Sequence, residues 1–140
     1  MLVHATTIDI ASCGVLLLGE PGSGKSDLAL RLIAEGAILV SDDQTDVEIV
    51  DGWLRAFAPR LICGLIEMRG FGLVRTATTS ATRLRLAVSL VMETPPRMPE
   101  PGTWSLPDHA DPSLPLVELS PFEASATAKL RQALAFVLNA

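Results

Sequence analysis

Residues 15–35 read VLLLGEPGSGKSDLALRLIAE, and this stretch decides the fold. It opens with four apolar residues, 15–18, which are typical of a strand buried on both faces. A glycine-rich turn follows, and from Lys25 onward apolar residues recur at intervals of three or four, the spacing of one helix face. The stretch therefore predicts a buried strand, a tight loop and an amphipathic helix that ends near Gly36.

The glycine-rich turn is a complete Walker A pattern, GxxxxGK[ST], at residues 19–26. Between a strand and a helix, such a loop points successive backbone N–H groups at phosphate oxygens, and the helix N-terminus adds a favourable dipole. Lys25 would neutralise the β- and γ-phosphates, and the Ser26 hydroxyl would bind a metal ion. The expected nucleotide-binding residues are Gly19, Glu20, Pro21, Gly22, Ser23, Gly24, Lys25 and Ser26.

Two adjacent carboxylates, Asp42 and Asp43, follow a second apolar run at 37–40. A carboxylate at the carboxyl end of a buried strand is the usual Walker B position, where it serves a nucleotide-bound metal. Neighbouring strand residues point to opposite faces, so the two are expected to differ in role. One could act as a base toward a hydroxyl group while the other orients the metal. A solvated acidic turn is the alternative.

Two further polar residues, Glu67 and His4, differ from their surroundings. Glu67 lies in the apolar run LIEM, where a charge is costly unless it is paired or binds a metal, and an ion pair with Arg69 is the structural alternative. His4 lies on an alternating strand, where a lone histidine more often has a structural role. The residues by themselves leave both positions open between structure and chemistry.

The rest of the chain predicts more sheet and a second helix. Asp51-Gly52 between two alternating segments indicates a two-residue hairpin. The segment SPFE at 120–123 is interpreted as a capping box that starts a C-terminal helix, which packs on the sheet. Expected strands are a half-exposed one at 3–10, a buried one at 37–40, the hairpin at 45–50 and 53–57, extended segments flanking a turn within 64–74, and strands at 84–91 and 114–119.

Length and hydrophobicity predict one domain. The chain has 140 residues and 49% hydrophobic content, enough for a single core, so 1–140 is expected to be one unit. Residues 94–115 hold seven of the ten prolines and predict a surface loop, because too little chain follows to fold alone. The predicted fold class is α/β: a mixed sheet with the loop helix on one face and the C-terminal helix packed against it.

Charge and cysteine content exclude several classes of partner. The net charge is -5, with no basic stripe to suit nucleic acid or an anionic membrane. No apolar run reaches the ~18 residues that span a bilayer, and no signal-peptide pattern is present. Cys13 and Cys63 lack metal-binding spacing and are expected to be buried, reduced thiols. We expect a cytoplasmic protein that binds neither nucleic acid nor membrane.

Four motifs in order resemble the catalytic domain of bacterial HPr kinase/phosphorylase: His4, the loop at 19–26, SDDQTDVE at 41–48 and LIEMRGFGLV at 65–74. The likeness implies a P-loop fold similar to that of phosphoenolpyruvate carboxykinase. It also implies an ATP- and Mg²⁺-dependent protein-serine kinase acting on an HPr-type phosphocarrier protein of the phosphotransferase system. Many members also remove the phosphate by phosphorolysis. The resemblance further implies a homo-oligomer, often a hexamer.

The same resemblance implies roles for individual residues. Magnesium would be held by Ser26 and Glu67. The two adjacent aspartates would supply the base that accepts the serine proton, with the second of them preferred. The histidine and the loop lysine would lie beside the transferring phosphate. The expected catalytic residues are therefore Asp43, Asp42, His4 and Lys25.

The chain departs from the long members of that family. They carry a further N-terminal domain, whereas this chain begins almost at the histidine and is expected to be a short form with the catalytic domain only. No arginine occurs at 120–125, where long members use arginines to bind the reacting phosphate, and Gln44 stands where an arginine is common. These departures predict that kinase activity outweighs phosphorolysis.

Two other functions remain alternatives. A small-molecule kinase would share the P-loop and an aspartate base, but it would usually carry a lid with several arginines, and residues 94–115 offer only Arg97. A nucleotide-sensing module without turnover would use the carboxylates structurally, so Asp43→Ala would change stability alone.

Overall fold

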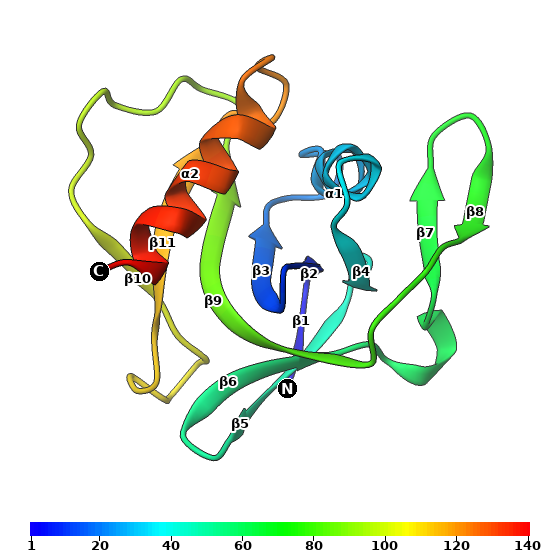
Figure 1. Ribbon diagram of the computed structural model, residues 1–140, viewed down its shortest axis with the longest axis horizontal. Coiled ribbons are helices and arrows are strands. Elements are labelled where there is room, and N and C mark those ends of the chain that lie inside the picture. The colour runs from blue at the N-terminus through cyan, green and yellow to red at the C-terminus, as the bar shows by residue number, and fades with distance from the viewer.

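The computed structural model describes residues 1–140 as a curled mixed sheet with two helices (Figure 1). The helices are α1 (Lys25–Ala34) and α2 (Ala126–Leu138). Both contribute to one hydrophobic cluster with residues of the sheet, so they cover the same face. Crossing a bilayer would take a longer and more apolar helix than either of them.

The main sheet has nine strands, and the long strand β9 (Ala81–Leu90) connects its parts. It pairs in parallel with β3 (Cys13–Leu18) and β11 (Leu114–Leu119), and antiparallel with β6 (Trp53–Phe57). The order is β1-β5-β6-β9-β3-β2-β4, with β10 joined to β11. The remaining strands are β1 (Leu2–Val3), β2 (Ala5–Ile10), β4 (Ile38–Ser41), β5 (Thr45–Val50), β10 (Gly102–Trp104) and the separate pair β7 (Leu65–Met68) and β8 (Gly72–Arg75).

A bulge in β9 allows this strand to serve two cores. Gly14 pairs with Leu84 and Val15 with Leu86, so Arg85 is an extra residue. Leu84 packs in one hydrophobic cluster and Leu86 in the other. Successive residues of β3 divide between the same clusters, which therefore lie on opposite faces of the sheet.

Most of the predicted elements are confirmed. The segment 15–35 forms β3, the loop and α1, and Asp51-Gly52 forms the turn of the β5–β6 hairpin. Residues 64–74 contain β7, a turn and most of β8, and the later strands and helix follow the expected order. The α/β class is confirmed, with both helices packed on the sheet.

A half-exposed strand was predicted at 3–10, and the predicted exposure is wrong. Thr6 and Thr7 are fully buried. The reason is the sheet order, because β2 lies between β3 and β4 and is covered on both faces. An alternating pattern describes a strand with one free face, and this strand has none.

The capping box predicted at 120–123 is wrong. Helix α2 begins at Ala126, with Ser125 as its N-cap, and the predicted residues form turns before it. Arg31 of α1 donates a hydrogen bond to the carbonyl oxygen of Pro121, which is itself buried. The segment is thus held in turns by local backbone bonds and contacts α1, although its local pattern favours a helix start.

Two smaller expectations also need correction. The proline-rich segment 94–115 is not only loop, because it contains β10, which pairs antiparallel with β11. The cysteines are free thiols, but Cys13 is half-buried and Cys63 is exposed, because Cys63 follows a short 3-10 turn at the surface. Neither thiol lies fully in the core.

A surface clamp joins the end of α1 to α2. Glu35 accepts hydrogen bonds from Arg131 Nε at 2.9 Å and from the Thr127 hydroxyl at 3.0 Å. The bond from Arg131 is the main reason that the pKa of Glu35 is held below its ordinary value. Because the folded pKa is lowered, the clamp stabilises the fold above the ordinary pKa, and this contribution is lost as pH falls through the lowered value.

Leu130→Ala is expected to lower the free energy of unfolding by about 2–5 kcal/mol, because it leaves a cavity in the core. Leu130 is 1% exposed and lies in the cluster that both helices share. Urea unfolding measures the loss. Phe136→Ala is the matched control, since Phe136 of the same helix is 77% exposed and should change stability by less than about 0.5 kcal/mol. Equal losses in the two variants would contradict the packing of α2.

Candidate active site

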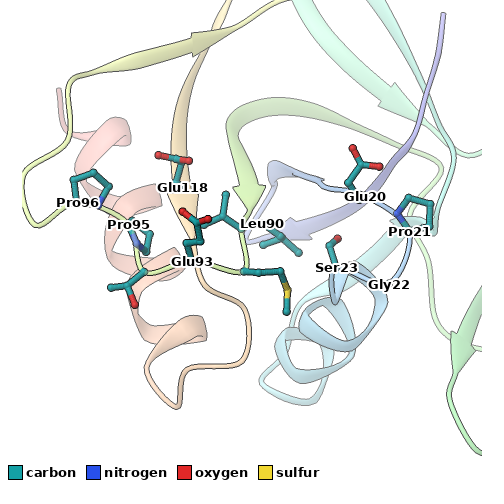
Figure 2. Close-up of a pocket in the computed structure, with 12 residues that line it drawn as sticks. Glu20, Pro21, Gly22, Ser23, Leu90, Glu93, Pro95, Pro96 and Glu118 are labelled. Atoms are coloured by element: carbon teal, nitrogen blue, oxygen red, sulfur yellow. The ribbon is translucent and has the colours of Figure 1, made fainter.

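The Walker A loop leaves β3 and turns directly into α1, and Figure 2 shows part of it on one side of a cleft. Ser23 N–H donates to the carbonyl oxygen of Glu20 at 3.0 Å, which closes the turn. Gly24 caps the helix at a φ of 101°, a conformation that other residues rarely adopt. A Cβ on Gly19 would lie 2.3 Å from Ser23 Oγ. The loop therefore needs glycine at both positions.

The loop presents unpaired hydrogen-bond donors. The backbone N–H groups of Gly22, Gly24, Lys25 and Ser26 have no acceptor within the chain. The hydroxyl of Ser23 is buried and also lacks a partner. A buried hydroxyl without a partner is rare in folded proteins, and with the four N–H groups it forms a cradle of donors. The residues present fit the phosphate chain of a nucleotide.

Lys25 lies across this cradle. Its side chain is buried, and its ammonium group donates to the carbonyl oxygens of Gly19 at 2.6 Å and Glu20 at 3.3 Å. An ammonium group has three N–H donors, so one is left for a phosphate oxygen. The loop thus holds the positive charge at the place where phosphates would bind.

Asp42 is the centre of the hydrogen-bond network beside the loop. Its side chain is buried, and Oδ1 accepts from the Thr6 hydroxyl at 2.9 Å and the Ser26 hydroxyl at 2.7 Å. Oδ2 accepts from the backbone N–H of Glu67 at 2.9 Å. One carboxylate therefore joins β2, the start of α1 and β7.

Asp43 has a different environment from its neighbour. Its side chain is exposed, and its carboxylate accepts no hydrogen bond from the protein. Its φ of 66° is in the left-handed region, a strained conformation that often occurs at functional sites. Its backbone N–H donates to Thr6 Oγ1 at 3.0 Å. The two adjacent carboxylates therefore meet different surroundings, one anchored and one free.

Glu67 and His4 lie at the margin of this network. Glu67 reaches it through its backbone N–H, while its side chain is exposed and makes no ion pair with Arg69. His4 is exposed between β1 and β2 and makes no hydrogen bond. Because Ala5 pairs with Leu18, the antiparallel register brings His4 level with Gly19. Of the predicted site residues, only Ser26 and Asp42 are hydrogen-bonded to each other through their side chains. Lys25 bonds to the loop carbonyls, Asp43 is held by its backbone, and the side chains of Glu67 and His4 lie outside the network.

A magnesium ion fits best at Ser26 and Asp42. Their side-chain oxygens are 2.7 Å apart, and a hydroxyl with a carboxylate at this position is the usual P-loop pair. No group of three or more His, Cys, Asp or Glu residues is arranged to hold a metal. Magnesium keeps several water ligands and takes one or two from the protein together with phosphate oxygens, so a hydroxyl and one carboxylate suffice as protein ligands.

The residue that sequence reasoning missed is Thr6. Its hydroxyl donates to Asp42 and accepts from the backbone N–H of Asp43, so it fixes both aspartates. Beside it, Thr7 and Thr45 are hydrogen-bonded at 2.8 Å and carry the network into the sheet. The sequence signal was weak, because threonine is equally common on a half-exposed strand.

Thr6→Val is expected to lower the free energy of unfolding by about 1–3 kcal/mol, because the buried Asp42 carboxylate loses a donor and the backbone N–H of Asp43 loses its acceptor. Thr6→Ser keeps the hydroxyl group and should retain most of that stability. Urea unfolding of the two variants makes the comparison. Equal stability of the valine and serine variants would show that the hydroxyl does not anchor the aspartates.

The sheet, the loop and the paired serine and aspartate define a P-loop α/β domain. The family described as the HPr Serine kinase C-terminal domain matches residues 1–95. Because this match covers more than half of the chain, the chain belongs to that family.

Similar proteins agree with the family. The HPr kinase/phosphorylase of Clostridium beijerinckii is 40% identical over 76 residues, which is 54% of this chain and 25% of that protein. The one of Clostridium kluyveri is 43% identical over 72 residues, 51% of this chain and 23% of the relative. The chain thus spans about a quarter of the length of these curated relatives.

A solved structure is similar over nearly the whole chain. The HPr(Ser) kinase/phosphatase from Coxiella burnetii has a TM-score of 0.77 at 24% identity, and the match covers 96% of this chain and 88% of that one. This likeness includes α2 and the strands after residue 95, beyond the family match. The predicted fold type is confirmed.

Proposed function

We propose that the chain is the catalytic domain of an ATP- and Mg²⁺-dependent protein-serine kinase whose substrate is an HPr-type phosphocarrier protein of the phosphotransferase system. The observation that carries the proposal is the contact between Ser26 and Asp42 beneath a cradle of free N–H groups, with the exposed carboxylate of Asp43 beside it. Family membership gives the reaction class.

The P-loop residues bind and polarise the donor. Residues 19–26 hold the phosphate chain by their free N–H groups, and Lys25 keeps its third N–H for the charge that develops on the transferring group. Ser26 and Asp42 would hold the magnesium ion, and the side chain of Glu67, whose backbone N–H bonds to Asp42, would be a further ligand. When bound, magnesium neutralises charge on the β- and γ-phosphates. His4 is level with the start of the loop, and by family likeness it would lie beside the reacting phosphate.

Asp43 is the base in this proposal. Its exposed carboxylate is free to accept the proton of the carrier's serine hydroxyl. The serine oxygen forms a bond to the γ-phosphorus while the bond to the β–γ bridging oxygen breaks, and ADP leaves. Asp43 is preferred to Asp42 as the base, because the Asp42 carboxylate is buried and accepts three hydrogen bonds, whereas that of Asp43 is exposed and accepts none.

The kinase direction is proposed to outweigh phosphorolysis. Segment 120–125 supplies no arginine for a second phosphate. The guanidinium of Arg31, which contacts this segment at the carbonyl oxygen of Pro121, is also engaged by Asp27 at 3.2 Å. Arg31 is therefore not free to bind inorganic phosphate.

Self-association is a further part of the proposal. Large apolar side chains are exposed in and next to the β7–β8 segment of the chain: Leu61 at 94%, Phe71 at 81% and Leu73 at 70% exposure. Large exposed apolar side chains are candidates for an interaction site. We propose a cytoplasmic homo-oligomer of single-domain chains, a hexamer by family likeness, and sedimentation analysis tests the number of subunits. A monomer at micromolar concentration would contradict it.

The experiment is transfer of labelled γ-phosphate from MgATP to an HPr-type carrier. Label is expected on the wild-type carrier and absent from a carrier whose target serine is replaced by alanine. Addition of inorganic phosphate to the labelled carrier then measures phosphorolysis, which should be slower than transfer. Tight ATP binding without label on the carrier would refute the kinase and favour a small-molecule kinase or a nucleotide sensor.

A further inference from the structure

A cleft of about 730 Å³ adjoins the outer side of the P-loop (Figure 2). One wall is the loop itself, from Glu20 to Ser23. The opposite wall is the end of β9 with the following residues to Pro96, together with Glu118 of β11. Figure 2 shows Glu93 and Glu118 across the cleft from Glu20. The volume lies within the range of small-molecule sites, roughly 300–1,000 Å³.

The charge of the cleft has one sign. Its lining includes three carboxylates, Glu20, Glu93 and Glu118, and no lysine, arginine or histidine. None of the three takes part in an ion pair. Free carboxylates accept hydrogen bonds and repel anions. The cleft therefore suits a ligand part that carries hydroxyl or amino groups and no phosphate.

Apolar residues also line the cleft, together with Ser23 and Thr94. Leu90 forms a buried base, while Met92 is 72% exposed and stands with Pro95 and Pro96 on the wall opposite the P-loop. Methionine adapts its shape to a partner and makes favourable contacts with aromatic rings. An aromatic ring could thus pack between the proline-rich wall and the loop.

We infer that this cleft binds the nucleoside of the phosphoryl donor, with Glu118 and Glu93 accepting hydrogen bonds from the ribose hydroxyls and the base packed against Met92. The inference rests on the proposed function and adds the site that recognises the ribose and the base of the phosphoryl donor. The cleft is continuous with the phosphate-binding cradle, because the loop residues Gly22 and Ser23 belong to both. A chain of phosphates that leaves the cradle on this side enters the cleft.

Glu118→Ala tests the inference through binding alone. Dissociation constants are measured by calorimetry for three magnesium complexes, those of ATP, 2′-deoxy-ATP and inorganic tripolyphosphate, with the wild type and the variant. The wild type should bind ATP about tenfold more tightly than 2′-deoxy-ATP, which corresponds to one lost hydrogen bond to a charged group. The variant should lose that difference. Glu100→Ala is the control, because Glu100 is equally exposed but does not line the cleft.

Tripolyphosphate separates the inference from the function on which it rests. Because Glu118→Ala removes a negative charge, the affinity for tripolyphosphate should stay unchanged or rise. A loss of affinity confined to ATP therefore supports the ribose contact. If the wild type binds tripolyphosphate as tightly as ATP, the inferred nucleoside site is overturned, while the proposed kinase function is unaffected. If neither ligand binds the wild type, both are overturned. A variant that keeps its ATP affinity but shows a raised KM for the carrier would overturn the nucleoside site in favour of acceptor binding.

Discussion

Lys25→Met is expected to reduce phosphoryl transfer by about 10²–10³-fold, the usual cost of removing one preorganised charge partner of a transition state. The Lys25 ammonium is fixed by the carbonyl oxygens of Gly19 and Glu20 and keeps one N–H for the phosphates. Methionine has a similar length and fills the same buried space without the charge. Initial rates of label transfer from MgATP to the carrier measure the effect.

The control for this substitution is Lys129→Met. Lys129 is exposed on α2, where it pairs with Glu123 far from the loop in the sequence, and its loss should leave the transfer rate within about twofold. A Lys25→Met variant that transfers phosphate at the rate of Lys129→Met would show that the loop lysine has no part in the chemistry.

Asp42→Ala is expected to lower the free energy of unfolding by about 3 kcal/mol or more. The substitution leaves three donors without their acceptor: the hydroxyl groups of Thr6 and Ser26 and the backbone N–H of Glu67. Hydrogen bonds to a charged group contribute about 1.5–3 kcal/mol each, although they do not add fully. Urea unfolding of the purified variant measures the loss, and magnesium-dependent ATP binding should be lost with it.

Asp43→Ala is the matched control for stability. Asp43 is adjacent, but its carboxylate is exposed and accepts no hydrogen bond, so its loss should change the free energy of unfolding by less than about 0.5 kcal/mol. Equal destabilisation by the two alanine substitutions would contradict the division between an anchored and a free carboxylate.

Local patterns in the sequence were enough to predict most of the fold. The strand, loop and helix of 15–35 depend on contiguous residues, and the Asp51-Gly52 turn fixes the register of the β5–β6 hairpin by itself. The Walker A loop and the aspartates at the end of β4 were found in the same way, because phosphate and metal binding require these residue types at fixed positions along the chain. Such features need no knowledge of the partners in space.

The features that were missed depend on contacts between distant segments. The burial of Thr6 follows from the position of β2 between β3 and β4, which no pattern within β2 states. Helix α2 begins only at Ala126, and the segment before it contacts Arg31, about ninety residues away, at Pro121. Likewise Glu67 meets Asp42 through its backbone, where residue type carries no signal. Side-chain patterns cannot report contacts of this kind.

The central claim, a serine-directed kinase site with Asp43 as its base, is tested most directly by single-turnover transfer of labelled phosphate from MgATP to the carrier by wild type and Asp43→Asn. Asparagine keeps the size of the side chain and removes its basicity. The prediction is unchanged ATP affinity and urea stability, with the transfer rate reduced at least about 10²-fold. Transfer by Asp43→Asn at the wild-type rate would contradict the claim.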